Sequence, residues 1–252
     1  MISNKIKVIL VPALVLSVAT SALLAGVWSA TGTITGSPHD LSANALLSSA
    51  TADNGEICVY CHTPHAANTA FTGAPLWNKA TPSGTFTMYG TTIAGTATDA
   101  TPASPSLACL SCHDGASAID SIVNAPGSGM NTVAGTKNIV SGLSTTYGGN
   151  IGGAPGTATA GNPDLSNDHP VSIVYTAGKA SLRATTTTLT DVTTTAWVGA
   201  TTIANLLRNT KVECGSCHDP HNGYATQGTD TEVNFLRHTN AGSKLCLGCH
   251  AK

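Results

Sequence analysis

All eight cysteines of the chain occur in four copies of one short pattern, in which two residues separate two cysteines and a histidine follows at once. The copies are Cys58–His62, Cys109–His113, Cys214–His218 and Cys246–His250. Disulfides, a redox-active dithiol or zinc sites all use paired cysteines, but none of them requires that histidine. By chance, four such histidines out of four are expected about once in a million trials, and the pattern is typical of covalent c-type haem attachment.

The chemistry of attachment accounts for the spacing. Two thiols add across the two vinyl groups of one porphyrin, and two intervening residues let a single turn of chain present both sulfurs. The adjacent histidine then supplies the proximal ligand of the iron. We therefore expect four covalent haem c groups, with thioether bonds to Cys58, Cys61, Cys109, Cys112, Cys214, Cys217, Cys246 and Cys249 and proximal ligands from His62, His113, His218 and His250. Two zinc sites of four cysteines each are the alternative interpretation.

Five further histidines remain for four vacant sixth positions, so we expect every iron to be ligated by two histidines. Such an iron is low-spin and exchanges electrons without binding a small substrate, which predicts an electron-transfer protein and not an enzyme. We expect His238 to be the histidine that is not a ligand. The expected sixth ligands are His39, His65, His169 and His221.

Two of these sixth ligands follow a proximal histidine by three residues, as His65 follows His62 and His221 follows His218. Three residues apart on one turn, the two rings lie on neighbouring faces and are too close to bind one iron from opposite sides. The second ring of each pair is therefore expected to reach another haem. His169 is the one histidine between the second and third motifs, and we expect it to serve the second haem.

The composition argues against a conventional core. Charged residues make up 10% of the chain and aromatic residues 4%, although 41% of the residues are hydrophobic. Few large side chains are available for burial, so we expect the haems to fill the interior. A net charge of −2 gives no basic surface for nucleic acid. The expected fold is a multihaem cytochrome c, mostly loop with short helices and a few short strands wrapped around a continuous haem stack.

Three segments between the motifs have a recognisable local pattern. Residues Ala125 to Asp164 are rich in small and polar residues and are expected to be loop. The β-branched stretch from Thr185 to Thr202 predicts a short hairpin or a pair of strands. The apolar spacing from Ile203 to Val212 favours a short helix that leads into the third motif.

The N-terminus has the pattern of a secretory signal. Lys5 and Lys7 precede an apolar stretch from Val8 to Val27, and small residues follow. We expect residues 1–29 to be a signal peptide cleaved between about residues 22 and 30, and residues 30–252 to form a single tetrahaem domain. A retained membrane anchor is the alternative. Val27 stands where a lipoprotein signal has cysteine, so a lipid anchor is not expected.

The paired motif of Ile57–His65, the segment Asp168–Ser172 and the ending of Cys214–Asn222 followed by Leu245–His250 resemble the doubled-CxxCH multihaem cytochromes. Within them, the chain most resembles the OmcE-type tetrahaem cytochromes of outer-surface filaments. This resemblance implies a secreted homopolymer, exported through the periplasm to the outer surface, that conducts electrons to other redox proteins or extracellular acceptors. It also implies that one iron per subunit takes its sixth ligand from the neighbouring subunit, with His39 the favoured donor and His65 or His221 next.

Two other functions remain open from the sequence. A soluble periplasmic tetrahaem electron shuttle would use the same ligands within one subunit. A membrane-anchored tetrahaem quinol dehydrogenase would keep Val8 to Val27 as an uncleaved helix.

Overall fold

The computed structural model describes residues 34, 35, 37, 39–41, 56–89, 96–114, 117, 122–124, 151, 163–179, 181–222 and 235–252. All eight cysteines and all nine histidines lie within these ranges. The predicted signal peptide and most of the predicted loop from Ala125 to Asp164 lie outside them. None of the helices in the described ranges is long and apolar enough to cross a membrane.

Regular structure is scarce in the described residues, and each element is short, as the sequence predicts. The helices are α1 (Ser104–His113), α2 (Leu189–Thr193), α3 (Ile203–Leu206), α4 (Cys214–Cys217) and α5 (Lys244–Leu247), with a 3-10 turn η1 (Ala241–Ser243) before α5. Strands β1 (Ile173–Val174) and β2 (Lys211–Val212) pair antiparallel, with Ile173 opposite Val212. The rest of the described chain is loop and turn held by scattered backbone hydrogen bonds.

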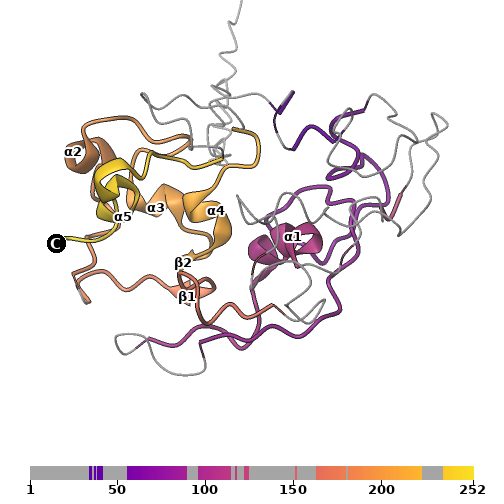
Figure 1. Cartoon of the computed structure of the whole chain (residues 1–252), viewed down its shortest axis with the longest axis horizontal. Coiled ribbons are helices and arrows are strands. Elements are labelled where there is room, and N and C mark those ends of the chain that lie inside the picture. The colour runs from indigo at the N-terminus through magenta and orange to yellow at the C-terminus, as the bar shows by residue number, and fades with distance from the viewer. Residues whose placement is uncertain are drawn as a thin grey trace, which may run out of the picture.

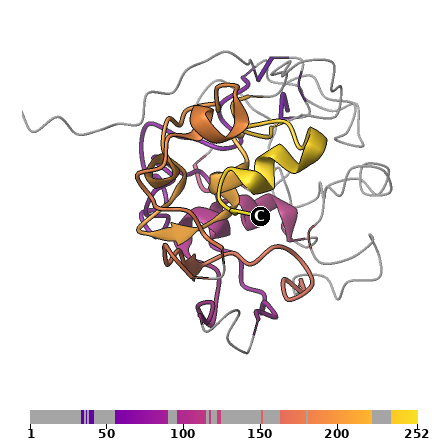
Figure 2. The same ribbon diagram turned by 90° about the vertical axis from the view of Figure 1, so that its left-hand side faces the viewer.

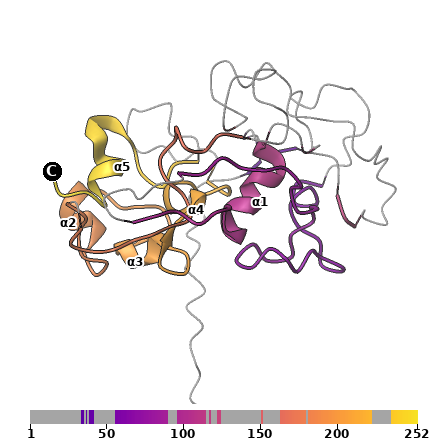
Figure 3. The ribbon, with the colours of Figure 1, turned by 90° about the horizontal axis from the view of Figure 1, so that it is seen from below.

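The described elements are spread across the molecule in an order that differs from their order in the chain. Figure 1 shows α1 on one side, α2, α3 and α5 on the other, and α4 with the small sheet between them. The view from below in Figure 3 keeps this order, and Figure 2 looks onto the side that carries α5 and the C-terminus. The first two cysteine motifs therefore lie on one side, and the fourth lies on the other.

The larger hydrophobic core of the described residues lies in the C-terminal part. Its buried members are Tyr175, Leu189, Trp197, Ile203 and Leu206. Leu245 and Cys249, from the fourth motif and the residues before it, pack against this cluster. Burial of these side chains stabilises the loops that carry the fourth motif, at about 1.5–3 kcal/mol for each fully buried aliphatic side chain.

A second cluster is much smaller and lies at the first motif. Val59 and Tyr60 are the two residues between its cysteines, and both are buried, with Leu41 and Ile122 packed against them. The first motif therefore uses its own intervening residues as core. This agrees with a composition that offers few large side chains elsewhere.

The prediction of strands from Thr185 to Thr202 is wrong in part. Leu189–Thr193 forms helix α2, while isolated bridges join Thr188 to Thr202 and Trp197 to Ala200. The helix forms because Leu189 and Thr193 turn into the core, where the Thr193 hydroxyl donates to the Leu189 carbonyl and accepts from the Trp197 indole. Tertiary packing overrides the strand propensity of the threonines.

The helix predicted from Ile203 is present but ends earlier than expected. Helix α3 stops at Leu206, and Lys211–Val212 then pairs as strand β2. Asn205 and Thr202 form a reciprocal capping box at its N-terminus, which accounts for the start of the helix. Asn209 and Thr210 both have positive φ angles, of 50° and 64°, and this reversal separates the helix from the strand.

Candidate haem-binding site

Each of the four motifs folds as a single turn that brings its two cysteines to one side. The second motif lies at the end of α1, and the third motif forms α4. In the first, third and fourth motifs the amide of the histidine donates to the carbonyl of the first cysteine, at 2.8, 3.0 and 2.9 Å. A turn of this kind is the geometry that attachment of two thiols to one porphyrin edge requires.

The eight cysteines are free thiols, and each is at least partly accessible. Burial raises the pKa of Cys61 to about 12 and the pKa values of Cys217 and Cys249 to about 11. At neutral pH these three are protonated, which is the form whose hydrogen and sulfur add across a vinyl group. In the described ranges no three histidine, cysteine, aspartate or glutamate side chains are arranged to hold a metal ion directly.

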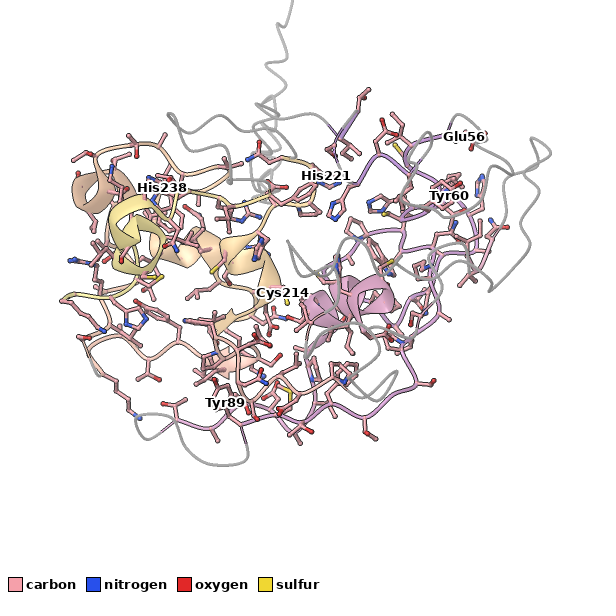
Figure 4. All side chains as sticks on the ribbon, in the orientation of Figure 1. Glu56, Tyr60, Tyr89, Cys214, His221 and His238 are labelled. Carbon is pink, nitrogen blue, oxygen red and sulfur yellow. The ribbon has the colours of Figure 1, made fainter. Side chains whose placement is uncertain are left out.

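Successive motifs lie next to each other through their cysteines. The thiols of Cys109 and Cys214 lie close enough to interact, which raises the pKa of Cys109 and lowers that of Cys214. Figure 4 shows Cys214 between α4 and α1, and these two helices are in contact. The pKa of Cys61 is raised mainly by burial and secondly by the charge of Cys112. Cys61 of the first motif therefore lies near Cys112 of the second.

The third and fourth motifs are linked in the same way, because Cys249 contributes to the raised pKa of Cys217. The first and second motifs are joined by a further contact, in which the indole of Trp77 donates to the Ser111 hydroxyl at 3.1 Å. Trp77 also meets the ring of His62 edge-on, with centroids 5.5 Å apart. The four attachment points therefore form a row in sequence order.

The proximal histidine of the first motif has a second histidine beside it. The rings of His62 and His221 are nearly parallel, at 21°, with centroids 6.1 Å apart. The Nδ1 of His62 donates to the Pro75 carbonyl at 2.7 Å, and the Nδ1 of His221 lies 3.8 Å from the Asp219 carboxylate. In Figure 4, His221 lies on the side of its segment that faces the first motif, where Tyr60 is labelled.

The proximal histidine of the second motif is paired with His39. The centroids of the His39 and His113 rings are again 6.1 Å apart, with an interplanar angle of 57°. The Nδ1 of His39 donates to the Pro220 carbonyl at 3.1 Å, and its ring stacks on Phe235 at 4.0 Å. Burial, followed by the charge of His113, lowers the pKa of His39 to about 4, so the ring is neutral at pH 7.

The other two expected sixth ligands are exposed. The pKa of His250 is lowered mainly by burial and secondly by the charge of His169, so His169 lies near the fourth motif. The Nδ1 of His169 donates to the Pro170 carbonyl at 3.1 Å. His169 is therefore nearer to the fourth motif than the sequence suggested. The backbone carbonyl of His65 accepts from Thr63 and Asn124, which holds its loop while the ring faces solvent.

His238 differs from the other candidates because it is fully buried and both its ring nitrogens are engaged. Its Nδ1 donates to the Thr239 carbonyl at 3.0 Å, and its Nε2 accepts from the Thr195 hydroxyl at 2.6 Å. The ring also lies 5.0 Å from the ring of Trp197. Figure 4 places it among α2 and α5, inside the C-terminal core.

Several residues that support the motifs have no strong sequence signal. Buried Glu213 precedes the third motif and accepts hydrogen bonds from Ser106 and Ser172, so it ties α4 to α1. Arg237 donates to the carbonyl of Gly215 at 2.8 Å and pairs with Asp219. In the sequence, the only indication that Asp219 has a structural role is its position between the two histidines His218 and His221.

Residues 208–252, which carry the third and fourth motifs, match the protein-family model of the doubled CXXCH motif. This match supports a multihaem c-type cytochrome that binds haem covalently and transfers electrons. A search of curated proteins found no match to the chain.

Proposed function

We propose that the chain is a tetrahaem cytochrome that conducts electrons along a row of four covalently attached, bis-histidine haems. The observation that carries this proposal is the adjacency of successive attachment points, above all the packing of α1, which ends in the second motif, against α4, which is the third. Two motifs in such contact hold their haems close together. When bound, c-type haem supplies one-electron exchange at its iron.

The residues present fit that group. Each motif offers two free thiols on one turn followed by a histidine, and a second imidazole lies beside two of the proximal histidines. The rings of His39 and His62 are held by backbone carbonyls that accept from Nδ1, which leaves Nε2 of each ring for the metal. The ligand set is that expected from the sequence, with His238 kept as a structural residue of the core.

The purified protein tests the proposal directly. Its mass is expected to exceed that of the mature chain by four haem groups, and every iron is expected to be low-spin by electron paramagnetic resonance. The reduced protein in its assembled form is expected to leave carbon monoxide unbound, because no iron then has an open position. An open iron in the wild-type protein, or fewer than four haems, would contradict the proposal.

We further infer that the protein is exported and assembles into a filament, in line with its resemblance to the OmcE-type cytochromes. The row of motifs has two ends, the first motif and the fourth, so an end-to-end arrangement of subunits would continue it. Electron microscopy of the secreted fraction tests this inference, with filaments as the expected result. A protein that stays monomeric at all concentrations would refute it.

The resemblance favours His39 as the ligand supplied between subunits, but a specific observation supports a different assignment. His39 lies beside His113 of its own chain, with its ring stacked on Phe235. We therefore propose the exposed His65 as the donor to a neighbouring subunit. The same pairing of His39 with His113 favours the soluble shuttle as the second candidate function, because both axial ligands of the second haem would then come from one chain.

A further inference from the structure

We propose that His221 and His62 are the two axial ligands of the first haem, and that His39 and His113 are those of the second. This inference rests on the proposed function, since it assigns partners within the same set of bis-histidine sites. It differs from the sequence-based expectation, which gave the second haem His169.

The separation of the rings is the first argument. A metal–imidazole bond is about 2.0 Å long, and the centroid of a five-membered ring with bonds of about 1.33 Å lies about 1.1 Å from each ring atom. Two imidazoles that bind one metal from opposite sides therefore have centroids about 6.2 Å apart. The His62–His221 and His39–His113 centroids are both 6.1 Å apart.

The partners of the rings are the second argument. A metal-binding histidine donates its other ring nitrogen to a carbonyl or carboxylate, which fixes the tautomer and the ring orientation. The Nδ1 atoms of His62 and His39 donate to the carbonyls of Pro75 and Pro220, and that of His221 lies near Asp219. Buried His238 also donates from Nδ1 to a carbonyl, that of Thr239, but its Nε2 accepts from Thr195, so neither nitrogen is left for a metal.

The assignment explains how the third motif can serve two haems. The turn of α4 ends at His218, whose backbone is extended, with φ −112° and ψ 147°. His221 therefore leaves the helix and turns toward His62, while His218 stays with its own cysteines. The carbonyl of the intervening Pro220 holds His39. One short peptide thus positions ligands for the first, second and third haems.

The ring angles make the two sites distinguishable by electron paramagnetic resonance. Nearly parallel axial imidazoles give a rhombic low-spin signal, whereas strongly tilted ones shift the signal toward a large maximum g value. The angles of 21° and 57° predict a rhombic first haem and a second haem with the larger g value. His221→Ala is expected to remove the rhombic signal of one iron, and His39→Ala the large-g signal of one iron.

A chain without the first haem provides an independent test. In the Cys58→Ala/Cys61→Ala variant, shown by mass to hold three haems, adding His221→Ala is expected to open no iron. Adding His39→Ala is expected to convert one of the three irons to high-spin, which serves as the matched control. A new high-spin iron with His221→Ala in this background would overturn the first assignment.

The outcomes separate this inference from the proposed function. A wild-type protein with an open iron or a missing haem would refute the proposed function. A wild-type protein with four low-spin haems, whose rhombic signal survives His221→Ala and whose large-g signal survives His39→Ala, would refute the pairing alone. Electron paramagnetic resonance of the four-haem protein and its single histidine variants tests the pairing even if the three-haem variant fails to fold.

Discussion

At the scale of single residues, the glycine in the fourth motif has a steric role that the glycine in the third does not share. A Cβ atom at Gly248 would lie 2.3 Å from Cζ2 of Trp197, whereas a Cβ at Gly215 would meet nothing within 4 Å. The indole is held in the core with 5% of its surface exposed, so it has little room to move. The turn of the fourth motif therefore packs directly on the C-terminal core.

Gly248→Ala is expected to destabilise the folded protein by about 1–3 kcal/mol, the usual cost of overpacking, and to lower the occupancy of the fourth haem. Gly215→Ala is the matched control and is expected to be neutral or to stabilise the protein by up to about 1 kcal/mol, because alanine has the higher helix propensity and its Cβ meets nothing. Denaturant unfolding and haem content by mass measure the two effects. Equal stability of the two variants would contradict the packing argument.

A second residue-scale feature is the buried cation between the first two motifs. Lys79 is 1% exposed, and its charge lowers the pKa values of both Cys61 and Cys112 against the opposing effect of burial. A positive charge near a haem favours the reduced iron, because reduction adds an electron. Lys79 is therefore expected to raise the reduction potential of the first and second haems.

Lys79→Gln is expected to lower the potential of at least one haem. Two unit charges about 10 Å apart interact by about 1–2 kcal/mol at an effective dielectric constant of about 20, which corresponds to a shift of tens of millivolts. Lys179→Gln removes the same charge from an exposed position and is expected to change the potentials much less. Spectroscopic redox titration measures both, and identical titration curves for Lys79→Gln and wild type would refute the role.

At the scale of elements, the loop that follows α4 depends on a buried ion pair. The guanidinium of Arg237 lies 3.4 Å from the Asp219 carboxylate, and the two side chains are 4% and 5% exposed. Arg237 also donates to the carbonyls of Gly215 and Val198 at 2.8 Å. One side chain therefore joins the third motif, the segment that precedes α3 and the loop that carries His221.

Arg237→Met is expected to destabilise the protein by about 3–5 kcal/mol, because it removes the guanidinium that is paired with the buried Asp219 carboxylate. The double variant Arg237→Met/Asp219→Asn is expected to recover part of that loss, since no unpaired charge remains. Chemical unfolding of the haem-loaded protein measures each step. If the single variant costs no more than the double variant, the ion pair is not what holds this loop.

The elements also show which parts of the structure a sequence can reveal. The turn within each motif follows from the spacing of its cysteines, and the start of α3 follows from local capping by Thr202 and Asn205. The sequence did not predict helix α2, because the helix depends on side-chain packing. Leu189 packs into the hydrophobic core, and the hydroxyl of Thr193 accepts a hydrogen bond from the indole of Trp197. Long-range packing of this kind leaves no local periodicity in a threonine-rich segment.

In the haem-binding site, too, the features set by local sequence could be predicted and those set by long-range contacts could not. The cysteines and proximal histidines are fixed by a contiguous pattern, so they could be named from the sequence. The ring neighbours of His39 and His221 could not be named, because His113 and His62 come from distant parts of the chain. The sequence also predicted that His221 would share a turn with His218, whereas the helix ends at Cys217 and the backbone of His218 is extended.

At the scale of the whole molecule, the order of the attachment points governs how subunits could join. Cysteines of successive motifs lie near enough to shift one another's pKa values, from the first motif to the second, the second to the third and the third to the fourth. Electrons would thus enter at one end of the row and leave at the other. Association through these ends is opposed by little charge repulsion, because the net charge is only −2.

His65→Ala tests whether the ends join through a shared ligand. His65 is exposed and follows the first motif, so its ring is placed to bind an iron of a neighbouring subunit. The variant is expected to yield single subunits or short assemblies by electron microscopy, with one high-spin iron per chain. Added imidazole is expected to restore the low-spin state without restoring filaments, since a free ligand saturates the iron but bridges nothing. Full-length filaments with every iron low-spin in the variant would refute this role for His65.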